Sequence, residues 1–117
     1  MTVTAERDSA IVFDLATTSV SRNVSDRARE LAAGRVRLTS INGMDPSQRQ
    51  VMLAAGVRLP DTWFARGVIA GRSGIYHAEI LVLDGGQVRA YCTCMARRLC
   101  SHLVALYAVA IDANGGA

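Results

Sequence analysis

Apolar and polar side chains alternate along three stretches in the second half of the chain. Residues 64–70, 75–83 and 87–91 place apolar side chains at every second position, which is typical of β-strands with one buried face. Glycine-containing segments at 71–74 and 84–86 separate these stretches and predict tight turns. The pattern therefore predicts an antiparallel meander of three strands.

The period of the apolar positions changes after the meander. Leu103, Leu106, Tyr107, Ala110 and Ile111 follow one another at spacings of three and four residues. Side chains at these spacings share one face of an α-helix. We therefore expect a helix with one apolar stripe at the C-terminal end of the chain.

Two further helices are predicted before the meander. The segment Asp45–Gln48 contains a capping aspartate, a proline at the first helical position and a glutamine that can complete a capping box, so a helix should run to about Ala55. Ser25 can cap an earlier helix that ends near Ala33, with Gly34 available as a left-handed stop.

The remaining N-terminal sequence contains one predicted strand and one ambiguous segment. Residues 35–41 alternate between polar and apolar and predict a strand, whereas the apolar run 10–16 is compatible with either a strand or a helix. We predict an α+β fold: a small antiparallel β-meander plus a C-terminal helix, joined by a metal-binding knuckle, with one or two N-terminal helices. The predicted division is an N-terminal segment at 1–63, a finger at 64–112 and a frayed tail at 113–117.

Between the last predicted strand and the terminal helix, three cysteines and a histidine form a C-x-C-x5-C-x-H array. Its members are Cys92, Cys94, Cys100 and His102, and the array uses every cysteine in the chain. Structural Zn²⁺ sites take four thiolate or imidazole ligands in a tetrahedron, so the array predicts Zn²⁺ as a cofactor. Residues two apart point about 200° away from each other on a helix. We therefore expect Cys92 and Cys94 at the end of the strand, and Cys100 and His102 in the turn that leads into the helix.

The array resembles the SWIM-type zinc finger, in which C-x-C and C-x-H follow a β-meander and precede a short helix. The resemblance extends from about Phe64 to Ile111, with Tyr91–Cys94 closing the last strand and Cys100–Leu106 matching the C-x-H and the apolar helix. The spacer of five residues lies at the short end of the family's range. The resemblance implies a structural zinc ion and a role in binding nucleic acid or a protein partner.

Other interpretations of these four residues are less compatible with the sequence. The cysteines could be small core residues and the histidine a buried hydrogen-bonding group. A disulfide framework is disfavoured by the odd number of cysteines and by the strain of a C-x-C bridge, and an iron–sulfur cluster usually requires a fourth cysteine. His77 is the alternative nitrogen ligand, although its position within an alternating strand predicts exposure to solvent or to a partner.

The basic residues are arginines without exception, and this excludes some functions. The chain has 13 arginines against ten acidic residues, a net charge of +3 and no lysine, so Schiff-base chemistry and a P-loop lysine are ruled out. Arg97 and Arg98, within the knuckle, can balance the negative charge of a zinc ion bound to three thiolates. Alternatively they contact nucleic-acid phosphates, assisted by Arg89 and by Arg72.

Other residues could enlarge such a basic surface. Arg35 and Arg37 lie on one side of a predicted strand, and Arg66 lies on the first strand of the meander. Trp63, Phe64 and Tyr91 could stack on bases, although aromatic residues at strand positions usually belong to the core.

Two functional classes follow from these observations, and neither is an enzyme. The chain has no paired carboxylates, nucleophile elbow or open metal position. We expect a small zinc-binding accessory protein that binds DNA through the finger, and alternatively a protein-interaction adaptor. A mean hydropathy of +0.21 favours some coverage of apolar surface by a partner or by a second copy in a homodimer. No signal peptide or membrane-spanning run is evident, so we expect a cytoplasmic location, where thiols stay reduced and available to metal.

Overall fold

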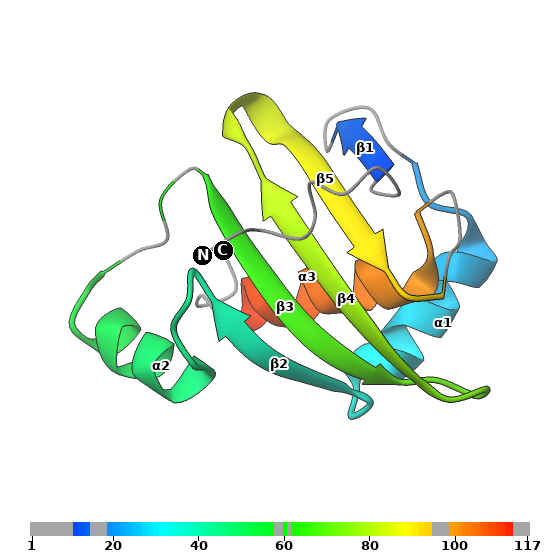
Figure 1. Cartoon of the computed structure of the whole chain (residues 1–117), viewed down its shortest axis with the longest axis horizontal. Helices are drawn as coiled ribbons and strands as arrows, with labels where there is room; N and C mark the ends of the chain where they lie inside the picture. The colour runs from blue at the N-terminus through cyan, green and yellow to red at the C-terminus, as the bar shows by residue number, and fades with distance from the viewer. Residues whose placement is uncertain (1–10, 15–18, 58–59, 61, 95–98, 114–117) are drawn as a thin grey trace.

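The computed structural model describes residues 11–14, 19–57, 60, 62–94 and 99–113. This part of the chain contains five strands and three helices (Figure 1), in the order β1 (Ile11–Asp14), α1 (Arg22–Ala32), β2 (Val36–Ile41), α2 (Pro46–Ala54), β3 (Trp63–Ala70), β4 (Ile75–Val82), β5 (Gln87–Cys92) and α3 (Ser101–Ala113). A 3₁₀ turn at Asp84–Gly86 joins β4 to β5. The α+β class is confirmed, and so are the meander and the helix that follows the cysteine array.

All five strands belong to one antiparallel sheet with the order β1-β5-β4-β3-β2. The meander β3-β4-β5 occupies the centre, and strands from the N-terminal part of the chain form both edges. The ambiguous run near the N-terminus contains strand β1, which pairs with β5 from Ile11↔Ala90 to Asp14↔Gln87. Residues before and after position 63 therefore share a sheet, and the division of the chain into two segments stays a prediction.

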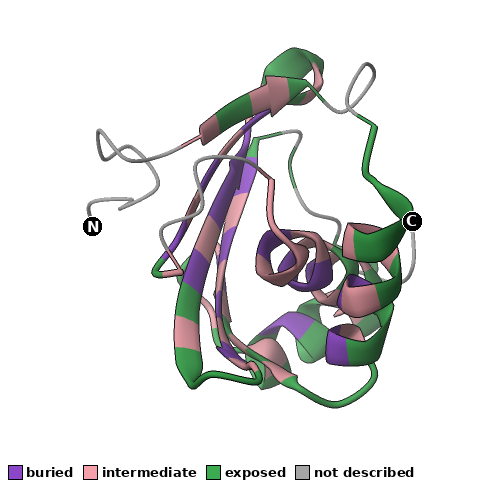
Figure 2. Ribbon diagram, turned by 90° about the vertical axis from the view of Figure 1, so that its right-hand side faces the viewer, coloured by how far each residue is buried: buried purple, intermediate pink, exposed green. Residues whose placement is uncertain are grey.

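Helices α1 and α3 cover the same face of the sheet (Figures 1 and 2), and α2 lies beside the end of β2. Strand alternation sends one set of side chains towards these helices, and Figure 2 shows buried positions in both the sheet and the helices. The resulting core is continuous between the layers and includes Ala65, Ile69, Ala78, Ile80, Val88 and Ala90 from the sheet, with Leu31, Leu103 and Leu106 from the helices.

Gly67 allows α3 to pack closely on β3. A Cβ atom at this position would lie 2.6 Å from Cδ1 of Leu106 and 3.2 Å from the carbonyl oxygen of Arg37. Real Cβ contacts are longer than the first of these distances, so a neighbouring atom would have to shift if a larger residue stood here. A side chain as small as alanine would force Leu106 to move.

Strand β2 contains an irregularity that keeps its apolar residues on the helix-covered face. Leu38 pairs with Gly67 and Ile41 pairs with Ala65, and the register shifts between Leu38 and Ser40. In a regular strand, residues three apart point to opposite faces. The β-bulge adds one residue, so Leu38 and Ile41 both contribute to the core.

The structure confirms one predicted helix start and corrects the other. In α2, the Asp45 side chain accepts from the backbone N–H of Gln48, whose side chain accepts from the backbone N–H of Asp45, as the capping box requires. Helix α1 begins one turn earlier than expected, because its N-cap is Ser21 and not Ser25. Gly34 does not act as a left-handed stop, since its φ is not positive.

None of the helices in the described residues combines the length and the apolar character needed to cross a bilayer.

Candidate metal centre

The four residues of the array meet where the sheet joins the last helix. Cys92 is the final residue of β5, Cys94 lies in the turn that follows, Cys100 immediately precedes α3, and His102 is the second residue of that helix. One potential ligand atom from each residue lies within 4.8 Å of all the others. The folded chain therefore brings together the complete donor set that the sequence predicts.

Local backbone structure explains how each half of the array is held. The ladder between β4 and β5 continues past Cys92, because Thr93 donates its backbone N–H to the carbonyl of His77 and accepts the backbone N–H of His77 at its side chain. On the other side, the carbonyl of Cys100 accepts from the N–H of Val104 and opens the first turn of α3. A strand end and a helix start thus present their sulfur and nitrogen atoms to one point.

The separation of sulfur and nitrogen in this cluster fits a tetrahedral metal. Sγ of Cys92 lies 3.6 Å from Nδ1 of His102. With Zn–S near 2.3 Å and Zn–N near 2.0–2.1 Å, the edge of a regular tetrahedron between these two ligands is about 3.6 Å. All three cysteines are free, so the thiols are available as ligands. The cluster can hold a metal ion, and a set of three sulfurs and one imidazole is typical of Zn²⁺.

Two residues that the motif does not contain position the His102 ring. The ring of Tyr76 stacks on the imidazole at a centroid distance of 4.4 Å and an interplanar angle of 27°. On the Nε2 side, a Cβ atom at Gly71 would lie 3.3 Å from Nε2 and 2.7 Å from the ring of Tyr76. Because Nδ1 faces the sulfur atoms and Nε2 faces the β3–β4 turn, the structure favours Nδ1 as the ligand atom.

The cysteines are electrostatically unequal before any metal binds. A hydrogen bond with Cys100 and burial raise the pKa of Cys92 well above its ordinary value. The same hydrogen bond lowers the pKa of Cys100 to about 5, helped by the backbone N–H of Leu103 at the start of α3. A thiolate at Cys100 beside a thiol at Cys92 is therefore the favoured arrangement of this pair, and a thiolate is the form that binds metal.

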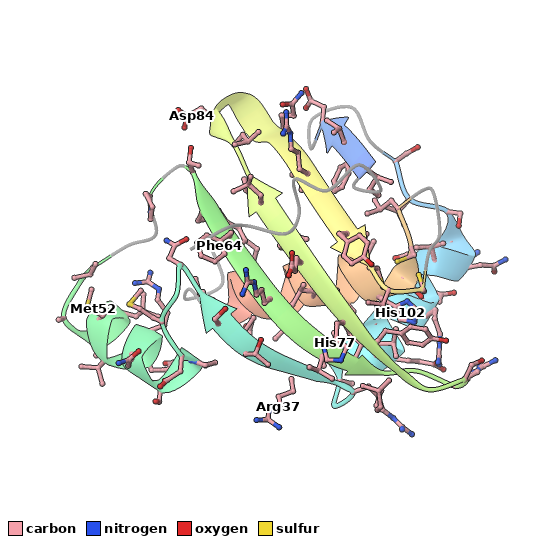
Figure 3. All side chains as sticks on the ribbon, viewed as in Figure 1. Arg37, Met52, Phe64, His77, Asp84 and His102 are labelled. Atoms are coloured by element: carbon pink, nitrogen blue, oxygen red, sulfur yellow. The ribbon has the colours of Figure 1, made fainter. Side chains whose placement is uncertain are left out.

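The structure describes two of the predicted nucleic-acid residues, Arg72 and Arg89, and they lie on different parts of the sheet. Arg89 lies on β5 and points to the face of the sheet that α1 and α3 leave uncovered, away from the sulfur atoms. Arg72 is exposed in the β3–β4 turn and follows Gly71 in the sequence. Arg97 and Arg98 lie outside the described residues. His77 is exposed on β4 and does not belong to the ligand cluster (Figure 3), so the choice of His102 as the nitrogen ligand agrees with the geometry.

Comparisons with protein-family models, with curated proteins and with solved structures found no match to this chain. The SWIM resemblance therefore depends on the motif and on the elements that carry it.

Changing Gly71 to alanine should weaken metal binding without changing a ligand. The new Cβ would displace the ring of Tyr76 and press on Nε2 of His102. Substitution of a residue that orients a ligand typically lowers metal affinity by about 10- to 100-fold. We expect a loss in this range for zinc, measured by competition with a chromophoric chelator.

Gly34→Ala is the matched control for this change. A Cβ at Gly34 has no neighbour within 4 Å, and neither glycine has a positive φ, so both substitutions alter the backbone preference in the same way. Equal zinc affinities for the two variants would show that packing at Gly71 does not position His102.

Proposed function

We propose that this chain is a SWIM-type zinc-finger protein that holds a structural Zn²⁺ and associates with nucleic acid, with DNA as the expected partner. The observation that carries the zinc assignment is the convergence of three sulfurs and one imidazole, with a sulfur–nitrogen separation that matches a tetrahedral edge. Zinc bound here would connect the end of β5 to the start of α3.

A structural role for the ion follows from the number of ligands. Four protein ligands fill a tetrahedral site and leave no position for a water molecule or a substrate, as catalytic zinc requires. We therefore propose a binding function and no catalysis. Because the ligands are reduced thiols, we place the protein in a reducing compartment such as the cytoplasm.

The nucleic-acid part of the proposal is supported by the arginines. A chain with a net charge of +3 offers guanidinium groups, including Arg72 in the exposed β3–β4 turn and Arg89 on the strand that ends at Cys92. Guanidinium groups match phosphate geometry in two parallel hydrogen bonds. Binding should be electrostatic and modest in strength, since the net charge is small.

A protein-interaction role is the second candidate, and one feature favours it. An apolar pocket of about 190 Å³ opens beside the metal centre, and its lining contains Phe13, Val20, Ile80, Leu99, Leu103, Val104 and Tyr107. The pocket is smaller than most ligand sites, which have about 300–1,000 Å³. Its size suits a single large apolar side chain from a partner protein or from a second copy of this chain.

A salt titration separates the two candidates. Zinc-loaded protein is expected to bind fluorescent DNA at low salt, with an affinity that falls log-linearly as salt increases. Treatment with a chelator should weaken this binding at least tenfold, because the metal fixes the elements that carry the arginines. Absence of binding at the lowest salt would contradict the nucleic-acid proposal and leave the adaptor role.

A further inference from the structure

One face of the sheet carries no helix in the described part of the chain. Helices α1 and α3 lie behind the sheet in the view of Figure 3, and Arg37, Phe64 and His77 lie on the opposite side. Among the residues that strand alternation places there are six that we call the open-face residues: Arg37, Phe64, Arg66, His77, Arg89 and Tyr91.

The strand register arranges these residues in neighbouring rows. In one row, Arg66 of β3 is opposite Glu79 of β4, which is opposite Tyr91 of β5. The next row towards the β4–β5 turn contains Phe64, Leu81 and Arg89 in the same strand order. Strands are about 4.8 Å apart and residues on one face repeat about every 6.8 Å, so members of adjacent rows lie within reach of a single extended ligand.

A third row completes the surface on the side of the β3–β4 turn. Arg37 of β2 is opposite Val68, which is opposite His77 of β4. The backbone of His77 is hydrogen-bonded to Thr93, the residue between the ligands Cys92 and Cys94. The open face therefore continues to the edge of the metal centre, and a metal that holds this segment also holds the end of the surface.

The charges on this face favour an anionic ligand. Three arginines and two carboxylates, Glu79 and Asp14, lie on this face, which leaves a surplus of one positive charge. Glu79 is already engaged with Arg66, at 3.4 Å between Oε1 and Nε. Within the described residues, Arg37 and Arg89 form no ion pair. Nε of Arg89 is buried and has no hydrogen-bond partner, so a donor on this face is unsatisfied.

The shape and the rings favour a single strand over a duplex. The major groove of a duplex admits a helix or a two-stranded ribbon, and a five-stranded sheet is too wide to enter it. A sheet surface with arginines between aromatic rings is instead the arrangement on which unpaired bases stack, while guanidinium groups contact the backbone. Phe64 and Tyr91, both half-buried on the central strands, place their rings on this face.

From these observations we infer that the open-face residues bind single-stranded nucleic acid. This inference rests on the proposed nucleic-acid function and names its surface and its ligand class. Phosphates are contacted by Arg37, Arg66 and Arg89, and bases stack on Tyr91 and Phe64. The zinc ion stabilises the end of the surface and does not touch the ligand.

The test compares a labelled oligonucleotide of about 12 thymidines with a duplex of equal length, in the zinc-loaded full-length protein. We expect at least tenfold tighter binding of the single strand. Arg37→Gln combined with Arg89→Gln should weaken this binding at least tenfold at low salt and reduce the magnitude of the log–log salt slope by about 1.4, or about 0.7 for each lost phosphate contact. Tyr91→Leu should lower the affinity for the single strand about tenfold, and Tyr91→Phe should retain most of that affinity.

The matched control is Arg22→Gln combined with Arg29→Gln on α1, in the helical layer. Both side chains are exposed, and the control removes the same two charges from the chain. Arg37→Gln alone keeps the test valid if the loss of Arg89 perturbs folding, because Arg37 is exposed.

Each result has one interpretation. Equal losses in the open-face and control variants would overturn the surface assignment and leave nucleic-acid binding intact. Equal or tighter binding of the duplex would overturn the single-strand assignment. If neither oligonucleotide bound at low salt, both this inference and the proposed function would fail.

Discussion

Replacing Cys100 by serine is expected to remove zinc from the protein and to lower its thermal stability by about 15 °C in zinc-containing buffer. A ligand that binds only the folded state adds RT ln(1 + [L]/Kd), or about 4 kcal/mol when free zinc exceeds Kd by about 1,000-fold. For a chain of this size, each kcal/mol corresponds to about 4 °C in the unfolding midpoint. Cys100 is only half-buried, so its replacement tests metal binding with little direct effect on the core. Metal content by mass spectrometry and melting by circular dichroism provide the measurements.

The control for this prediction is the same pair of proteins in the presence of a chelator. Without zinc, wild-type protein and Cys100→Ser should melt within a few degrees of each other, because the lost stabilisation belongs to the metal. A large difference that persists in chelator would assign the effect to packing. Full zinc occupancy in Cys100→Ser would contradict its role as a ligand.

The extent of unfolding on metal removal follows from the sheet. The sequence predicts a finger at 64–112 as the metal-dependent unit. In the structure, β1 pairs with β5 and β2 pairs with β3, and α1 packs on α3. Loss of order at the end of β5 therefore affects strands and a helix from the N-terminal part of the chain as well. We expect one cooperative transition in both metal-bound and metal-free protein, at different temperatures.

Local signals in the sequence were sufficient for much of this fold. The capping box of α2 lies within four consecutive residues, Asp45–Gln48, and needs no distant partner to form. Alternation along 75–83 correctly separated the buried Ala78 and Ile80 from the exposed His77. The ligand set was predictable for the same reason, because two short motifs with fixed spacing contain all four donors.

Features that depend on distant partners were not predictable. Ser21 and Ser25 offer the same capping chemistry, and the choice between them depends on packing of the whole helix, in which Ala28 and Leu31 are buried. The strand character of β1 comes from pairing with β5, more than 70 residues later, and a four-residue strand has too short a pattern to reveal it.

The burial of Arg49 was also not predictable from the local sequence. Its polarity and its place on a short helix predict exposure, yet it is 1% exposed and donates from Nη1 to the carbonyl of Val57 at 3.0 Å. This bond ties α2 to the segment that follows it. Likewise, the stacking of Tyr76 on His102 joins a strand residue to a helix residue 26 positions later, and only the folded chain identifies the tyrosine as part of the metal centre.

The contact between Gly67 and Leu106 should be the most sensitive point of the core. Leu106 is fully buried at the centre of α3, and its replacement by alanine is expected to destabilise the protein by about 3 kcal/mol through lost burial and the resulting cavity. Gly67→Ala should cost about 2 kcal/mol for the opposite reason, because the added methyl group would be 2.6 Å from Cδ1 of Leu106. Denaturant unfolding of zinc-loaded protein measures both values.

The double variant tests whether the losses of stability in Gly67→Ala and Leu106→Ala come from the same contact. Truncating Leu106 removes the atom that the new methyl group would strike, so Gly67→Ala combined with Leu106→Ala should be at least about 1 kcal/mol more stable than the sum of the single losses predicts. The recovery should be partial, since the carbonyl oxygen of Arg37, 3.2 Å from the same position, cannot be removed by a side-chain change. Gly34→Ala combined with Leu106→Ala should be additive, because nothing lies near Gly34. Additivity in the Gly67 pair as well would show that the separation of β3 and α3 is set elsewhere than at this glycine.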